Sequence, residues 1–151
     1  AEILAAVESE SGRDMSADGS KLDGIESGAT ADDVEAGYYT PTGYTGTGVS
    51  SVTPGEFMYL RTGDVVMVSG LVVVNHSSTG AGRFFLSLPF SSSFDSTDDA
   101  SGNLTQPGGG TPNVGSIREE QTHTYERLQA DVYAQSTGNI YWRVLAMFRI
   151  K

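Results

Sequence analysis

The chain has 151 residues, of which 38% are hydrophobic, 19% are charged and 19 are glycines, and its formal net charge is −10. This composition predicts a turn-rich, mainly β protein, and the lack of cysteine excludes disulfides and thiolate metal sites. No run approaches the roughly 18 apolar residues of a membrane span, and no secretory signal opens the chain. The acidic balance argues against nucleic acid as a partner.

The negative charge is concentrated near the N-terminus. Residues 1–36 carry ten acidic residues against two basic ones, a net −8, whereas residues 37–151 carry nine against seven, a net −2. Within the first ten residues, Ile3, Leu4 and Val7 fit about two helical turns with a narrow apolar stripe. A helix this short is marginal alone, so the segment either pairs with identical copies or stays disordered.

From residue 37 onward the apolar period changes to two, and turn signals recur about every 8 to 12 residues, which predicts a strand-rich domain. The glycine- and serine-rich segments between the apolar runs, including residues 95–113, are predicted to be loops. The predicted strands are Tyr38 to Tyr44, Glu56 to Arg61, Val65 to Asn75, Gly82 to Leu88, Gly115 to Glu119, Thr122 to Tyr133 and Asn139 to Ile150.

Two hairpins are predicted from this pattern. The first joins EFMYLR to VVMVSGLVVV through residues 62–64, and its second strand is apolar on both faces, so both faces must be covered by a core or by a neighbouring subunit. The second turns at residues 136–138, and in that register Tyr133 faces Tyr141 while Asp131 faces Arg143. Val132, Leu128 and Trp142 would then lie on the core side, together with Ala130, Val144, Ala146 and Phe148.

The segment KLDGIESGATADD, residues 21–33, resembles the KLDGIE-x-GATAD linker that recurs in tail fibres and other receptor-binding proteins of bacteriophages and prophages. AEILAAV at the start resembles the short helical leader often found before that linker. YYTPT, FMYLRTGDVVMVSGLVVV and FFLSLPFSSSF, which follow, look like the carboxy-terminal head domain of such fibres, whose pattern runs Y-T-P-T, Y-x-R-x-G-x-V-V-x-V-S-G and L-P-x-x-S-x-F. Residues 95–121 depart most freely from it.

The resemblance implies a homotrimer with an intertwined stem at residues 1–36 and three antiparallel, jelly-roll-like β-sandwich heads at residues 37–151. Leu22 and Ile25 are too few to form a core in one chain, but three copies could enclose them on a threefold axis. The expected location is the distal tip of a fibre in the virion, beside the remaining tail proteins. The start at Ala1 suggests a piece of a longer fibre.

The sequence offers little support for an enzyme. Neither His76 nor His123 lies in a metal-binding spacing, and His76 is expected to be an exposed turn residue. Asp95, Asp98 and Asp99 are expected in a solvated loop, and the adjacent Glu119 and Glu120 should point to opposite faces of a strand. No cofactor or metal is expected, and a polysaccharide depolymerase is the least favoured function.

Non-covalent recognition of a bacterial surface receptor, such as an envelope polysaccharide, is the preferred function, because sugars bind to aromatic faces and planar polar groups. Threefold multivalency would raise the avidity of weak sites. A structural cap or trimerisation module of a fibre is the alternative, and the outer hairpin face could instead lie between subunits. The candidate receptor contacts are Tyr133, Tyr141, Arg143, Asp131, His76, Asp98, Asp99 and Asn103.

Overall fold

The described residues of the computed structural model are 34–91, 99–107, 114–120 and 127–150, and they belong to one unit of the chain. The predicted stem residues lie outside this set, as does the candidate contact Asp98. The stem residues concerned are Ile3, Leu4, Val7, Leu22 and Ile25. The packing proposed for the stem therefore stays a prediction.

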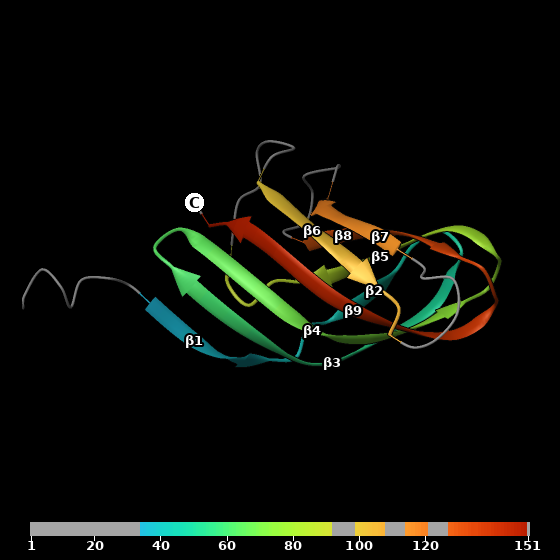
Figure 1. Ribbon diagram of the computed structural model, residues 1–151, viewed down its shortest axis with the longest axis horizontal. Helices are drawn as coiled ribbons and strands as arrows, with labels where there is room; N and C mark the ends of the chain where they lie inside the picture. The colour runs from blue at the N-terminus through green and yellow to red at the C-terminus, as the bar shows by residue number, and fades with distance from the viewer. Residues whose placement is uncertain (1–33, 92–98, 108–113, 121–126, 151) are drawn as a thin grey trace, which may run out of the picture. The chain divides into compact units, whose positions relative to one another are not determined.

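The described residues form nine strands in a single antiparallel sheet, in the order β1-β3-β4-β9-β6-β7-β8-β5-β2. Figure 1 shows β1, β3, β4, β9 and β6 side by side, with the remaining strands beyond them. The strands are β1 (Val34–Tyr39), β2 (Gly43–Thr45), β3 (Val49–Thr62), β4 (Val65–His76), β5 (Gly80–Ser87), β6 (Ala100–Thr105), β7 (Val114–Glu119), β8 (Arg127–Ala134) and β9 (Gly138–Arg149).

The sheet curls so that its inner face encloses the core. Strands β2 and β3 contact each other although they are not hydrogen-bonded neighbours, so the two ends of the sheet approach one another. The connection between β2 and β3 is held to β5 by a backbone hydrogen bond from the Arg83 amide to the Thr47 carbonyl, 2.8 Å long. The expected all-β antiparallel fold is confirmed. It is built from one continuous curled sheet, whereas the prediction was a sandwich.

The first predicted hairpin is confirmed. Strands β3 and β4 pair with Thr62 opposite Val65, and Gly63 at the turn has φ of 57°, a left-handed conformation that glycine adopts at little cost. A bulge between Pro54 and Phe57 interrupts the ladder farther along. Strand β3 is longer than predicted and begins at Val49.

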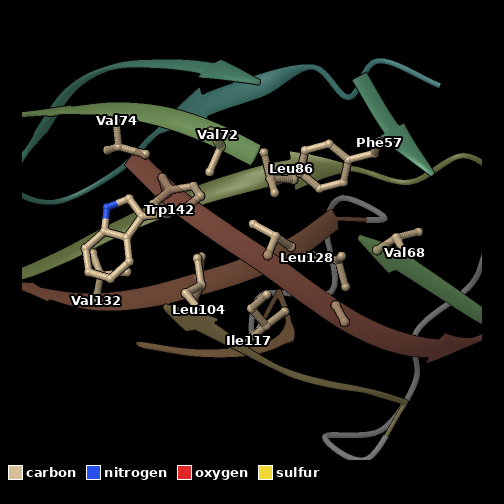
Figure 2. Close-up of a cluster of buried hydrophobic side chains, with 14 of the residues drawn as sticks. Phe57, Val68, Val72, Val74, Leu86, Leu104, Ile117, Leu128, Val132 and Trp142 are labelled. Atoms are coloured by element: carbon tan, nitrogen blue, oxygen red, sulfur yellow. The ribbon is translucent and has the colours of Figure 1, made fainter. Parts of the chain in front are cut away.

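The second predicted hairpin is wrong. Strand β8 pairs with β5 and β7, whereas β9 pairs with β4 and β6. The short connection between Ala134 and Gly138 therefore carries the chain from one half of the curled sheet to the other. The side chains predicted to share the core side, such as Val132 and Trp142, are indeed buried, but they meet across the core and not along a ladder (Figure 2).

Two further strand assignments differ from the prediction. The segment predicted to be a loop contains strand β6, which was not expected because its sequence ASGNLT has little apolar alternation. At the N-terminal side, the predicted strand Tyr38 to Tyr44 is divided between two strands, β1 and β2, which lie at opposite ends of the sheet order. Residues 40–42 connect these two strands, and Pro41 among them has no N–H to donate to a sheet ladder.

Buried aromatic and branched aliphatic side chains fill the core from all sides of the curl, as Figure 2 shows for fourteen of them. Trp142, Phe57, Phe84 and Phe148 are its largest members. Phe57 packs directly on Gly70: a Cβ atom at position 70 would lie 2.1 Å from Cδ1 of the ring. Glycine is required there because any side chain would overlap the ring.

Candidate functional site

The outer surface of the curled sheet has one apolar half, which we call the apolar face. It lies over β1, β3, β4 and β9. Across the strands, Met67 is paired with Leu60 on one side and Met147 on the other, and Arg143 and Arg149 flank these residues along β9. The exposed large apolar residues of this face are Val34, Tyr38, Met58, Leu60, Val65, Met67, Leu71, Tyr141, Leu145 and Met147. A contiguous patch of this kind is typical of a protein interface.

The other half, over β2, β5, β8 and β7, carries charged and aromatic side chains, and we call it the polar face. At its centre, Asp131 on β8 accepts a hydrogen bond at Oδ1 from Nε of Arg83 on β5 (2.8 Å). Its Oδ2 accepts a hydrogen bond from Nε2 of Gln129 (2.9 Å) and forms an ion pair with Nη2 of Arg118 on β7 (2.8 Å). This network joins three neighbouring strands.

The network determines the charge state of Asp131. Partial burial of its carboxyl group would by itself raise the pKa, but hydrogen bonds from Arg83 and Gln129, with the charges of Arg83 and Arg118, outweigh burial and lower the pKa below its usual value. Asp131 is therefore ionised at neutral pH. Two guanidinium groups share this one carboxylate, which leaves one positive charge in the network.

An aromatic and cationic pair lies beside the network. The guanidinium carbon of Arg127 lies 3.6 Å from the centroid of the Tyr44 ring, and Phe85 is the cross-strand partner of Tyr44. The backbone of Arg127 also accepts a hydrogen bond from the Glu120 amide (3.1 Å). Tyr44 and Phe85 are both half-buried, and the stacked guanidinium adds a planar polar group beside these aromatic rings, a combination found in small-molecule sites.

A small hollow opens next to this network. It has a volume of about 160 Å³ and is lined by Thr47, Ala81, Gly82, Arg83 and Asp131. Apart from Arg83, its walls are short side chains and backbone, so a ligand could approach the guanidinium group closely. We call this site the Arg83 hollow.

The structure divides the cluster that was predicted from the second hairpin. Tyr133 lies on β8 and is 62% exposed, so it stays on the polar face with Asp131, and its cross-strand partner Ala81 lines the Arg83 hollow. Tyr141 and Arg143 lie on β9, on the apolar face, where they are partners of Val73 and Leu71. The predicted cross-strand pairing of Asp131 with Arg143 is therefore wrong.

His76 was expected to be exposed, but it is buried with 1% of its surface accessible. It ends β4 on the inner face, and its Nε2 accepts a hydrogen bond from Nε1 of Trp142 (3.3 Å). The two rings meet edge to face, with centroids 6.1 Å apart. His76 is therefore part of the core and cannot contact a receptor directly.

Acidification is expected to destabilise the protein through His76. Burial lowers the pKa of His76, so the unfolded chain takes up a proton as the pH falls below about 6.5, before the folded protein does. Protonation of Nε2 would also break the hydrogen bond to Trp142, because Nε2 would then carry a proton that points at the N–H of the indole. We expect thermal unfolding at pH 5.5 to occur at a lower temperature than at pH 7.5, and the difference to shrink in His76→Gln. An equal difference in both proteins would contradict this role of His76.

Asp99 and Asn103 occupy different environments. Asp99 was expected in a solvated loop, but it is buried, and its carbonyl accepts a hydrogen bond from the Arg149 amide (2.9 Å). Burial at the start of β6 therefore removes it as a direct receptor contact. Asn103 on β6 lines a second hollow of about 350 Å³ beside Met67, Leu145 and Met147, at the margin of the apolar face.

Two adjacent carboxylates, Glu119 and Glu120, lie at the end of β7 and just after it. Glu119 and Glu120 are both buried, and the side-chain oxygens of Glu119 have no hydrogen-bond partner among the described residues. In the described part of the chain, no group of three or more histidine, cysteine, aspartate or glutamate residues could hold a metal ion. Nor does that part contain a helix long and apolar enough to cross a membrane.

The sequence interpretation missed two residues of the polar face, Arg83 and Arg118. Both were visible as isolated arginines at outward positions of predicted strands, but their meeting at Asp131 depends on β5 and β7 flanking β8. Only the sheet order brings them together, and the predicted hairpin had placed β9 in one of those positions.

Comparisons with known proteins identify no family. No protein-family model matches the chain, and no curated protein matches it. Among solved structures, the chain is similar to the reovirus attachment protein sigma1, which was crystallised in complex with alpha-2,3-sialyllactose. The TM-score is 0.46 and the sequence identity 18%, over 78% of this chain and 66% of the sigma1 chain, so this chain spans just under two thirds of that one. At this level of similarity, conclusions about function depend on the side chains described above.

Proposed function

We propose that the protein is the receptor-binding head of a phage or prophage tail fibre, which attaches to a bacterial envelope glycan by multivalent, non-covalent binding. The observation that carries this proposal is the division of its outer surface into an apolar face and a polar face. The first is suited to self-association, and the second offers arginine, aspartate and tyrosine side chains to a ligand. The resemblance of the linker and head motifs to phage fibres supports the viral setting.

In this proposal, three copies associate through their apolar faces. The exposed side chains around Met67 are mostly uncharged, so their burial against another copy would stabilise an oligomer. The three curled sheets would serve as sandwich-like heads at the fibre tip, with the residues that precede β1 as the stem and the other tail proteins behind them. The three polar faces would remain free, which gives the multivalency that weak sugar sites need.

The proposal is tested with the full 151-residue chain. Light scattering is expected to give about three times the 15.9 kDa chain mass, and the protein should bind to cells of a susceptible host and to one or more polysaccharides in an envelope-glycan array. Tyr133→Ala should weaken that binding about tenfold without changing the mass, because it removes an exposed ring from the polar face. Thr105→Ala, on β6, is the matched exposed control and should bind like the wild type.

The apolar face also supports a second candidate function, that of a structural cap which assembles the fibre while another protein contacts the host. The same experiment separates the two functions. A trimer that binds neither host cells nor any envelope glycan would favour the cap and contradict receptor binding. Loss of binding in Tyr133→Ala with the trimer intact would favour receptor binding.

A further inference from the structure

The guanidinium group of Arg83 is hydrogen-bonded through Nε, whereas its two terminal nitrogens make no hydrogen bond to the described residues. Within the described residues, only its Nε makes a hydrogen bond, to Oδ1 of Asp131 at 2.8 Å. The side chain is 39% exposed, and it lines the Arg83 hollow with Thr47, Ala81 and Gly82. The bond at Nε restrains the plane of the group, and it leaves the two terminal nitrogens as a planar pair of donors that a ligand in the hollow could use.

The charge near these donors is suited to an anion. Asp131 lines the same hollow, but both of its oxygens are already engaged, Oδ1 by Arg83 and Oδ2 by Arg118 and Gln129, so its negative charge is largely balanced. The second guanidinium, that of Arg118, leaves the network with one positive charge. An anionic group in the hollow would therefore meet a net attraction, whereas a neutral hydroxyl would gain only an ordinary hydrogen bond.

We infer that the Arg83 hollow binds an oxyanion carried by a sugar, either a carboxylate or a phosphate, and this inference rests on the proposed glycan-binding function. The terminal nitrogens of Arg83 would bind two oxygens of the anion side by side, which is the geometry that a planar guanidinium group favours. Tyr133, the exposed cross-strand partner of Ala81, would pack against the ring of the same sugar. Asp131 acts as a positioning residue, which orients Arg83 from the wall of the hollow.

Two variants separate orientation from simple charge attraction. Arg83→Lys retains the positive charge but loses the planar pair of donors. Asp131→Ala removes a negative charge beside the site, and it also removes the acceptor that holds Nε of Arg83. If orientation matters, both variants should bind an anionic sugar at least about tenfold more weakly, corresponding to about 1.4 kcal/mol. If only the net charge matters, Asp131→Ala should bind it more tightly.

The experiment is a calorimetric titration of the full 151-residue chain with three probes: a uronic-acid oligosaccharide, a glycerol-phosphate oligomer bearing sugars, and the uronic-acid oligosaccharide after reduction of its carboxyl groups. Wild-type protein is expected to bind at least one anionic probe and to bind the reduced probe more weakly. The carboxylate and phosphate probes distinguish the two sources of the anion. Arg61→Lys, on β3 and outside the polar face, is the matched control and should bind the probes like the wild type.

The outcomes also distinguish this inference from the function on which it rests. Equal binding of the anionic and reduced probes, or unchanged binding in Arg83→Lys, would overturn the inference while leaving glycan attachment intact. Tighter binding in Asp131→Ala would overturn the positioning role. Failure of the wild-type protein to bind any envelope glycan or host cell would instead contradict the proposed function. Light scattering and thermal unfolding establish that each variant remains folded and assembled.

Discussion

Met67→Lys is expected to convert the proposed trimer into a monomer of about 16 kDa by light scattering, close to the 15.9 kDa chain mass. Met67 lies on β4 between Leu60 and Met147, near the middle of the apolar face. In the assembled state a lysine there would place an ammonium group among apolar side chains of another copy. Burying a charge without a partner costs several kcal/mol, which is enough to dissociate an assembly of moderate affinity.

The fold of the monomer should be unaffected, because position 67 is on the outer face and 43% exposed. The matched control is Tyr133→Lys, which introduces the same charge at an exposed outward position of the polar face and should retain the wild-type mass. Met67→Leu, which preserves apolar volume, should also remain assembled. A wild-type monomer at micromolar concentration, or a Met67→Lys protein with the wild-type mass, would show that copies do not associate through this face.

Monomerisation should also reveal how much of the binding depends on avidity. Each Met67→Lys chain keeps its Arg83 hollow and its Tyr133 ring, so its affinity for a single short oligosaccharide should equal that of the wild type. Binding to host cells, which present many copies of the receptor, should fall by about 100-fold or more, since linked sites gain that much from effective concentration. Equal loss in both measurements would mean that the apolar face itself contacts the ligand.

The sequence was sufficient to predict which side chains of a strand face the core, but not which strands lie next to each other in the sheet. Alternation correctly assigned Trp142 and Val132 to the core, because a period of two depends only on the strand itself. A three-residue connection after Ala134 is compatible with a hairpin and also with a crossing between the two halves of a curled sheet. Nothing within β8 or β9 distinguishes these arrangements, so the predicted register was wrong while the faces were right.

The same distinction explains the result for the candidate site. Asp131 and Tyr133 were identified because both lie at outward positions of one strand, but Arg83 and Arg118 reach Asp131 only through the sheet order. His76 could have been placed correctly, since it continues the inward series of Val72 and Val74 at a spacing of two. The loop that follows His76 suggests exposure, but its even spacing from Val72 and Val74 places its side chain on the buried side of β4.

Trp142→Ala is expected to lower the free energy of unfolding by about 3–5 kcal/mol, the usual cost of deleting a buried aromatic side chain. Trp142 is completely buried on β9, where Figure 2 shows it next to Val132 and near Val72 and Val74. The substitution removes the indole from the centre of the curl and leaves a cavity between strands that the closed sheet cannot easily collapse. It also leaves Nε2 of His76 without its hydrogen-bond donor.

The measurement is urea unfolding monitored by circular dichroism at one fixed protein concentration, because an oligomer's apparent stability depends on concentration. Trp142→Phe should lose less than Trp142→Ala, since it keeps most of the packing and removes only the indole N–H and part of the ring. Arg143→Ala, the next residue on the opposite face of β9, should change stability by no more than about 0.5 kcal/mol. If Trp142→Ala and Arg143→Ala were equally stable, the two halves of the sheet would not close over Trp142, and the pairing of β9 with β4 and β6 would have to be reconsidered.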